Sequence, residues 1–360
     1  MAQAITIRWP FDMHHHVRTG HLLELIVPML TRRFAGAIIM PNTPVPITDY
    51  GLLRAYRKEV MKVAGSDFLP LMTFYLTDHL DPEVVTDALI AEAAIGVKYY
   101  PRGLTTNSES GVKDPASLWD PNSKPYRVLR CLHETGGTLL LHAADGFDRD
   151  GIELDPYEQE PHFIRETLPR IIDAHQGLHI SVEHLSTKEG AAFMEKNGSE
   201  TLGCSLTAQH LLLDRRDTHK GGLRPNRFWW PIIQSQEHKE ALRELARKGL
   251  PFVWLGSDSA PHPVGDKETD CCKGGVMMVH AGIELYAEAF DDMGALDKLE
   301  AFASLNGPRF YGIAPSEKRM TLVKEPWTVT TSFGIPADEP RMGEIKPFRL
   351  GEAVQWKLVA

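Results

Sequence analysis

Hydrophobic residues in this chain of 360 residues form short runs, and most runs are followed by a longer stretch with helical spacing. The runs are rich in aliphatic and aromatic residues, which is typical of buried strands. In the longer stretches, apolar residues recur every three to four positions, which indicates amphipathic helices. The expected strands are residues 5–9, 36–40, 68–75, 95–100, 138–142, 179–184, 202–207 and 252–256. The expected helices include residues 22–33, 52–63, 82–94, 163–174 and 238–248.

Strands that alternate with helices predict a parallel sheet with right-handed crossovers. About eight such units in a chain of this length favour a TIM (β/α)8 barrel. An open doubly wound sheet is the alternative, but it would normally carry a glycine-rich turn after its first strand, where this chain has histidines. We expect one barrel domain over residues 1–360, in which residues from about 312 form a C-terminal capping extension that ends in a strand-like stretch at 353–358.

The overall charge narrows the choice of partners. A net charge of -9 leaves no basic excess for binding nucleic acid, although a local pocket can still attract a small anion. The four cysteines show no disulfide spacing, which favours a reducing compartment. The adjacent Cys271 and Cys272 could form a thiolate metal site, but a second cysteine pair is missing from the sequence. The first residues lack the long apolar core of a signal peptide, and the sequence has no apolar run of bilayer length, so we expect a cytoplasmic protein with no membrane association.

Three consecutive histidines follow the first expected strand. In an extended chain alternate side chains share a face, so His14 and His16 point one way and His15 the other. A His-x-His pair at the carboxyl end of a barrel strand can hold a metal ion, and imidazole suits zinc. The triplet could also be a chance polar cluster or the remnant of an affinity tag, although a tag would normally be longer, so by itself the triplet does not establish a metal site.

Other strand ends strengthen the metal-site interpretation. His142, His184 and Asp258 each stand where a buried run ends, and the active sites of barrels form at that face. A single histidine there would be more typical of the core or of a helix cap. Three further ligand-type residues beside His14 and His16 together predict a metal centre at the carboxyl ends of the strands.

Lys98 is unusual because its neighbours in residues 95–100 are typical of a buried strand. Burial disfavours the charged ammonium and makes a neutral amine available to react with carbon dioxide. The resulting carbamate resembles a carboxylate and can bridge two metal ions. A lysine that snorkels to the surface or forms a buried ion pair is the alternative.

These residues resemble the amidohydrolase superfamily, and within it the class II, bacterial-type dihydroorotases. The resemblance covers nearly the whole chain in one order. It includes residues 104–108 and 255–262, within which the runs 105–108 (TTNS) and 258–262 (DSAPH) are its most specific motifs. Further matches are residues 12–18, 40–42, 97–101, 141–142, 182–188, 209–211, 221–225, 304–308 and 310–312.

The resemblance implies a centre of two Zn²⁺ ions that are bridged by N6-carboxylated Lys98 and a hydroxide. His14, His16 and Asp258 would hold one ion, and His142 and His184 the other. Asp258 would also be the catalytic acid and base in the reversible hydrolysis of (S)-dihydroorotate to N-carbamoyl-L-aspartate, a step of pyrimidine biosynthesis.

The resemblance also implies the substrate contacts and a homodimer. Arg18, Asn42 and His262 would bind the substrate carboxylate, for which the planar guanidinium of arginine is suited. Backbone groups near Trp230 and Gly274 would contact the pyrimidine ring. Thr105 and Thr106 fall on a loop that closes over the substrate in this family.

Several residues depart from the family pattern. Thr19 stands where the family often has aspartate, residues 143–145 replace a common Gly-Glu pair, and Trp230 is bulkier than the usual aliphatic residue. The cysteine pattern around residues 271–273 is also incomplete. Seven other histidines are expected on surfaces or at helix caps: His15, His133, His175, His179, His219, His238 and His280.

Three other functions are also compatible with the sequence. The chain could be another cyclic-amide hydrolase, such as a hydantoinase or allantoinase, although those relatives tend to be longer. It could be a mononuclear enzyme similar to adenosine deaminase, but such an enzyme has no bridging lysine. It could also be an inactive barrel scaffold, although scaffolds usually lose metal ligands.

Overall fold

The computed structural model describes residues 3–334 and 343–359, and eight parallel strands form its central sheet. The strands follow one another in sequence order, each hydrogen-bonded to the next, and helices lie between them. The strands are β2 (Phe11–His15), β3 (Gly36–Ile39), β4 (Leu69–Leu76), β5 (Gly96–Tyr99), β6 (Thr138–Leu141), β7 (His179–Val182), β8 (Leu202–Leu206) and β9 (Val253–Leu255). The prediction of a TIM barrel is confirmed, and the open doubly wound alternative is wrong.

Two hydrogen bonds draw the last strand to the first. The Asp258 amide donates to the His14 carbonyl at 2.9 Å, and the His16 amide donates to the Ser259 carbonyl at 3.2 Å. These bonds lie just beyond the end of β9, so the nearly closed barrel meets at the segment that carries the predicted metal ligands.

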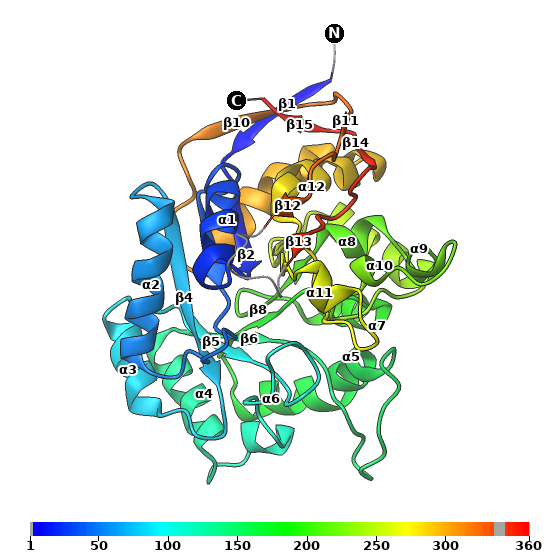
Figure 1. Cartoon of the computed structure of the whole chain (residues 1–360). Coiled ribbons are helices and arrows are strands. Elements are labelled where there is room, and N and C mark those ends of the chain that lie inside the picture. The colour runs from blue at the N-terminus through cyan, green and yellow to red at the C-terminus, as the bar shows by residue number, and fades with distance from the viewer. Residues whose placement is uncertain (1–2, 335–342, 360) are drawn as a thin grey trace.

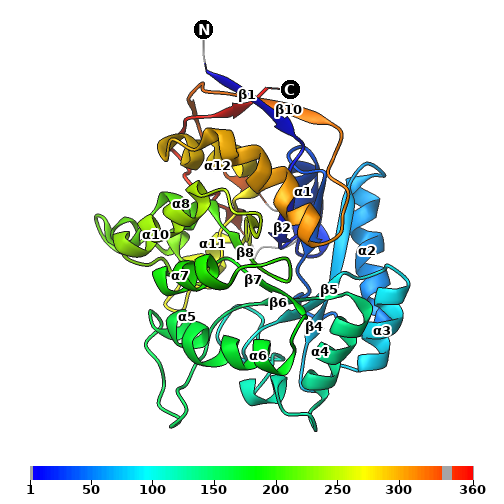
Figure 2. The same cartoon turned by 180° about the vertical axis from the view of Figure 1, so that it is seen from behind.

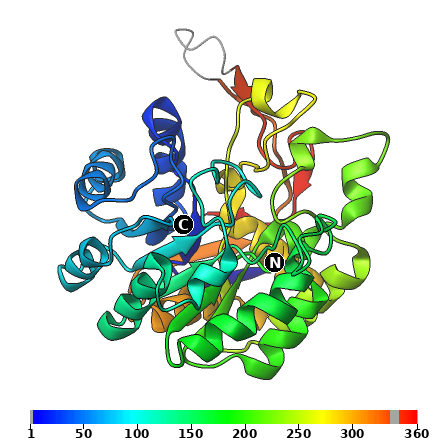
Figure 3. The ribbon, with the colours of Figure 1, turned by 90° about the horizontal axis from the view of Figure 1, so that it is seen from below.

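The helices lie in an arc around the strands, as Figure 3 shows. Local sequence explains where many begin, because Asp49, Ser123 and Thr187 each accept a hydrogen bond from a first-turn amide. The longer helices are α1 (Gly20–Thr31), α2 (Tyr50–Ala64), α3 (Pro82–Ile90), α4 (Lys124–Thr135), α6 (Leu168–Ala174), α7 (Lys188–Asn197), α10 (Gln236–Arg247) and α12 (Gly282–Asp292). The shorter ones are α5 (Gln159–His162), α8 (Ala208–Leu212), α9 (Arg215–His219), α11 (Val264–Lys267) and α13 (Asn306–Phe310). No helix within the described residues is both long and apolar enough to cross a lipid bilayer.

The assignment of residues 5–9 as the first barrel strand is wrong. β1 (Ala4–Arg8) instead pairs antiparallel with β10 (Arg319–Val323), which also pairs with β15 (Lys357–Leu358). This small sheet lies outside the barrel, beside both chain ends (Figures 1 and 2). The reason is burial: only one residue of β1 is buried, whereas every residue of β2 is buried, as a barrel strand requires.

The segment after α13 forms further short antiparallel pairs. β11 (Trp327–Thr328) pairs with β14 (Ala353–Val354), and β12 (Phe333–Gly334) pairs with β13 (Glu344–Ile345). Part of the expected capping extension, residues 335–342 and 360, lies outside the described residues. The division into one domain with an extension from about residue 312 stays a prediction.

An apolar cluster fills part of the barrel interior. Phe11, Ile38, Leu140 and Trp254 belong to it, and Phe310 of α13 packs on Trp254 with ring centroids 4.5 Å apart. Burial of these side chains stabilises the barrel through the hydrophobic effect. The polar side chains of β2 and of the later strand ends therefore lie beyond a packed interior, at the carboxyl ends of the strands.

Candidate metal centre

Four buried imidazole rings form a continuous row at the carboxyl ends of β2, β6 and β7. The ring centroids of His16 and His14 are 5.3 Å apart, those of His14 and His184 are 4.9 Å apart, and those of His184 and His142 are 4.7 Å apart. His14 and His16 come from β2 and the residue after it, whereas His142 and His184 follow β6 and β7. The barrel thus brings together four histidines that are far apart in the sequence.

Asp258 completes a three-residue donor cluster at one end of this row. Its Oδ1 atom lies 3.1 Å from His16 Nε2 and 3.3 Å from His14 Nε2. One ligand atom from each of these three residues lies within 4.8 Å of the others, and all three residues are buried. Two imidazole nitrogens and a carboxylate oxygen that converge in this way suit zinc or a related transition metal.

A second pair of nitrogen donors lies at the other end of the row. His142 Nδ1 and His184 Nε2 are 3.1 Å apart. Burial lowers the pKa of His142 to about 3 and that of His184 well below its ordinary value. Both rings are therefore neutral near pH 7 and offer the lone pairs that a metal ion requires.

Lys98 lies among these rings with no hydrogen-bond partner for its buried Nζ atom in the described structure. The nitrogen is 5.2 Å from the centre of the Tyr100 ring. Burial lowers the pKa of Lys98 to about 8, although the charges of Glu183 and Asp258 oppose this shift. A buried amine without a partner is costly, so this position fits a further group bound between the two donor sets.

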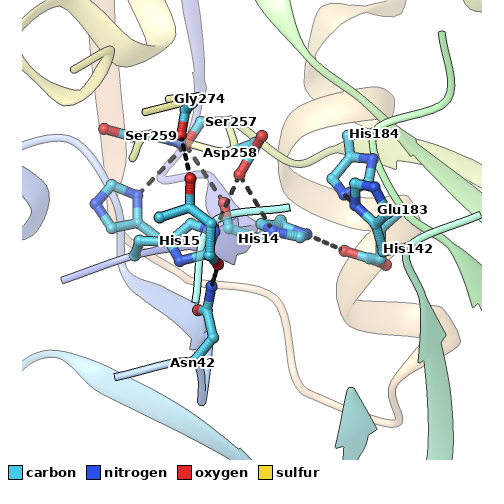
Figure 4. Close-up of polar contacts among 12 residues, drawn as sticks. His14, His15, Asn42, His142, Glu183, His184, Ser257, Asp258, Ser259 and Gly274 are labelled. Atoms are coloured by element: carbon cyan, nitrogen blue, oxygen red, sulfur yellow. Dashed lines mark hydrogen bonds and ion pairs between the residues drawn. The ribbon is translucent and has the colours of Figure 1, made fainter. Parts of the chain in front are cut away.

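Glu183 orients His14. Its Oε2 atom lies 2.6 Å from His14 Nδ1, so Glu183 can hold the Nδ1 proton while His14 Nε2 faces Asp258 (Figure 4). Burial alone would lower the pKa of His14, but its hydrogen bonds to Asp258 and Glu183 raise it. In the sequence, the stretch that contains Glu183 matches the family pattern but no role is predicted for this residue, although an acidic residue inside an expected buried strand is a signal for one.

Asp12 orients the neighbouring segments. Its carboxylate lies 2.7 Å from His15 Nδ1 and accepts the Ser257 amide at 2.8 Å. His15 is fully buried, and His280 is also buried, so their expected surface or helix-cap positions are wrong. In His15 the reason is Asp12, whose hydrogen bond compensates for the loss of water.

Two of the candidate ligands have strained backbones. His184 has φ 43° and Asp258 has φ 47°, a left-handed region that costs a non-glycine residue roughly 1–3 kcal/mol. Neighbouring strands hold both residues: the Ser205 hydroxyl accepts the His184 amide at 2.8 Å, and the Asp258 amide donates to the His14 carbonyl at 2.9 Å. In this backbone conformation both side chains belong to the candidate metal centre.

Glu160 anchors the chain just after His184. The carboxylate is buried and accepts the amides of Ser186 at 3.0 Å and Thr187 at 2.9 Å, together with both hydroxyls. Burial raises the pKa of Glu160 to about 7, and these hydrogen bonds oppose the rise. Glu160 thereby fixes the start of α7 relative to the donor row.

A cavity of about 330 Å³ adjoins the centre, and Arg18, Asn42 and His262 line it together with His16. Arg18 Nη2 lies 2.9 Å from His262 Nε2, and Arg18 Nε donates to the Pro261 carbonyl at 3.1 Å. The three residues expected to bind a carboxylate therefore share one cavity, with a guanidinium at its wall.

The predicted loop and ring contacts lie beside this cavity. Asn42 Nδ2 donates to the Thr106 carbonyl at 3.1 Å, and Thr106 Oγ1 donates to the Gly274 carbonyl at 3.0 Å. Trp230 packs on Gly274 so closely that a Cβ at Gly274 would lie 2.4 Å from Trp230 Cδ1. Thr105, one residue before, donates its amide to Ser108 Oγ at 3.0 Å. Trp230, Gly274, Thr105 and Thr106 are absent from the cavity lining formed by the described residues.

Comparisons with known proteins give one consistent result. No family model matches the chain. A dihydroorotase from Azoarcus sp. (strain BH72) is 40% identical over 358 residues, 99% of each chain. The solved dihydroorotase from Saccharomyces cerevisiae, in complex with 5-fluoroorotic acid, has a TM-score of 0.90 and 30% identity over 99% of this chain and 98% of its own. The solved dihydroorotase from Campylobacter jejuni has a TM-score of 0.86 and 30% identity over 100% of this chain and 98% of its own.

The barrel and the donor cluster at its strand ends define a metal-dependent enzyme of the amidohydrolase type. The likeness over the full length goes further, and the chain belongs to the dihydroorotase family. It is a cyclic amide hydrolase, and the resemblance found in the sequence is confirmed.

Proposed function

We propose that the chain interconverts (S)-dihydroorotate and N-carbamoyl-L-aspartate, using two zinc ions bridged by carboxylated Lys98. The observation that carries this proposal is the row of four histidines with Asp258, next to a buried Lys98 Nζ that has no partner in the described structure. In this reading His14, His16 and Asp258 hold one ion, and His142 and His184 hold the other.

The bridge follows from the chemistry of Lys98. With a pKa of about 8, about one amine in ten is neutral at pH 7, against about one in 3,000 for a lysine in water. The neutral nitrogen attacks the carbon of carbon dioxide, an N–C bond forms, and the lost proton passes to solvent. The product is an anion with two oxygens, which would bind both cations and remove the cost of a buried ammonium.

When bound, the two cations would supply Lewis-acid polarisation of the ring amide and lower the pKa of a bound water. Asp258 would accept the proton of the attacking water and deliver it to the ring nitrogen as the C–N bond breaks. Burial alone would raise the pKa of Asp258, but its hydrogen bonds to His14 and His16 hold it well below its usual range. Asp258 is therefore a carboxylate that can act first as a base.

The cavity would orient the substrate. Arg18 offers a planar donor group for the substrate carboxylate, with Asn42 and His262 beside it. Asn42 also holds the Thr106 carbonyl, so the loop with Thr105 and Thr106 would close against a residue that touches the substrate. Backbone groups near Trp230 and Gly274 would contact the pyrimidine ring.

The rival functions are less well supported. Relatives of about 40% identity over the whole length are dihydroorotases, which disfavours a hydantoinase or allantoinase. An inactive scaffold is disfavoured because all six expected metal-binding side chains are present. The cytoplasmic location and the homodimer stay predictions.

Turnover of both substrates by the zinc-loaded protein, with Lys98→Ala beside it, tests the proposal. We expect two zinc ions per wild-type chain and activity in both directions, loss of activity in the variant, and partial recovery with a short carboxylic acid. Inactivity toward both substrates with two metals bound would overturn the proposed substrate. Near-normal turnover by Asp258→Asn with both metals bound would overturn the role of Asp258.

A further inference from the structure

Lys267 is a buried cation without a carboxylate partner in the described part of the chain. It ends α11 and is only 2% exposed. The two nearest acidic residues in the sequence pair with other lysines: Asp266 with Lys273 at 3.1 Å, and Glu268 with Lys346 at 2.7 Å. A buried ammonium normally needs a partner, so its actual contacts are informative.

Those contacts are two backbone carbonyls from distant segments. Lys267 Nζ donates to the Phe228 carbonyl at 2.7 Å and to the Lys273 carbonyl at 2.7 Å. The Gly275 amide also donates to the Phe228 carbonyl, at 3.1 Å. Lys267 Nζ lies 5.7 Å from the centre of the Phe228 ring, within the range of a cation–π contact. Lys267 therefore ties residues 228–230 to residues 273–275.

The two tied segments carry Trp230 and Gly274. Trp230 packs against the α-carbon of Gly274, and the Gly274 carbonyl accepts the Thr106 hydroxyl at 3.0 Å. The distance between these segments thus determines where Trp230 stands and where the loop with Thr106 can dock. Lys273, on the same segment, lines the cavity that holds Arg18.

The charge of Lys267 also reaches this cavity. Burial is the main cause that lowers the pKa of His262, and the charges of Arg18 and Lys267 lower it further. Burial also lowers the pKa of Lys267 itself to about 8. Positive charge from Arg18, Lys267 and Lys273 therefore acts on His262 at this cavity, which Asp266, the partner of Lys273, also lines.

We propose that Lys267 is a positioning residue for substrate binding, which holds residues 228–230 and 273–275 at the spacing that the substrate ring and the closing loop require. This inference rests on the proposed function. Lys267 touches no reacting atom, so its loss acts on substrate affinity and leaves the metal centre intact.

Lys267→Met tests this inference, because methionine keeps the unbranched stem of the lysine side chain and removes the donor group. We expect KM for dihydroorotate to rise about 10-fold or more, with kcat within about threefold and zinc content unchanged. Lys346→Met is the matched control, since it removes a nearby lysine that pairs on the surface with Glu268, and it should keep the wild-type KM. A KM for Lys267→Met within twofold of wild type, measured well below its melting temperature, would overturn the proposal.

A second variant and a second readout keep the test decisive. If Lys267→Met does not fold, Lys267→Gln takes its place, because glutamine keeps a shorter hydrogen-bond donor. Its KM for dihydroorotate should rise above that of wild type, by less than the rise expected for Lys267→Met. An unchanged KM would contradict the proposal. Amide hydrogen exchange at residues 273–275 and near Thr106 should be faster in the Lys267 variant than in wild type. Unchanged exchange there would contradict the proposal that Lys267 holds residues 228–230 and 273–275 together. Because exchange needs no turnover, it still tests the role of Lys267 if the wild type fails to hydrolyse dihydroorotate.

Discussion

Replacement of Lys98 by methionine should stabilise the metal-free protein while abolishing its activity. The Nζ atom is buried and has no hydrogen-bond partner among the described residues, and the pKa falls from 10.5 to about 8. Because the pKa of Lys98 is lower in the folded state, the buried ammonium destabilises the folded protein. This destabilisation is complete below about pH 8 and disappears as the pH rises through 10.5. This shift corresponds to roughly 3 kcal/mol of the free energy of unfolding at pH 7. Methionine fills a similar volume without a charge.

Urea unfolding of both proteins, in chelator and buffer depleted of carbon dioxide, measures the difference. Lys98→Met should be more stable by roughly 3 kcal/mol at pH 7 and by only about 1 kcal/mol at pH 10. The exposed Lys58→Met is the control and should show no such pH-dependent gain. A variant less stable than wild type at pH 7, or a gap that does not change with pH, would refute the reasoning.

Three further changes probe the surroundings of the centre. Glu183→Gln should weaken zinc binding about 10- to 100-fold in a chelator competition, because His14 loses its carboxylate partner; unchanged affinity would exclude this orienting role. Arg18→Met should raise KM for dihydroorotate about 100-fold, with partial recovery in Arg18→Lys, and a similar KM in all three proteins would show that the carboxylate binds elsewhere. The raised pKa of Glu160 predicts that its stabilising contribution is complete below about pH 4.5 and is lost as pH rises through about 7. Between these two pH values, the free energy of unfolding of wild type, measured in urea, should therefore fall by up to about 3 kcal/mol relative to that of Glu160→Gln. A difference between the two proteins that stays constant with pH would contradict the shift in pKa.

The sequence predicted most of the barrel because seven of its strands, β3 to β9, match expected apolar runs that alternate with helical spacing, and β4 extends only one residue past its run. The strand that it missed, β2, contains one aspartate and two histidines among five buried residues. Hydrophobic patterning cannot detect such a strand, because its burial depends on hydrogen bonds to residues that are distant in the sequence. Ser257, which donates to Asp12, is 245 positions away.

In the candidate site, too, the sequence predicted residues at strand ends but not residues whose roles depend on contacts with distant segments. His142, His184 and Asp258 could be proposed because each lies just beyond a strand, and the topology of a parallel barrel brings such ends together. The roles of supporting residues could not be proposed in this way. Lys267 lies in a short helix outside any motif, and only the folded chain places Phe228 and Lys273 on either side of its ammonium.

The junction between the first and last barrel strands has a consequence for the order of assembly. The two hydrogen bonds that draw these strands together come from His14, His16, Asp258 and Ser259, and His16 and Asp258 are 242 positions apart. The donor cluster of His14, His16 and Asp258 therefore cannot form during synthesis until nearly three quarters of the chain has been made and the first and last barrel strands have met. Metal capture would then be a late event that locks the junction, so a stripped protein should open there first.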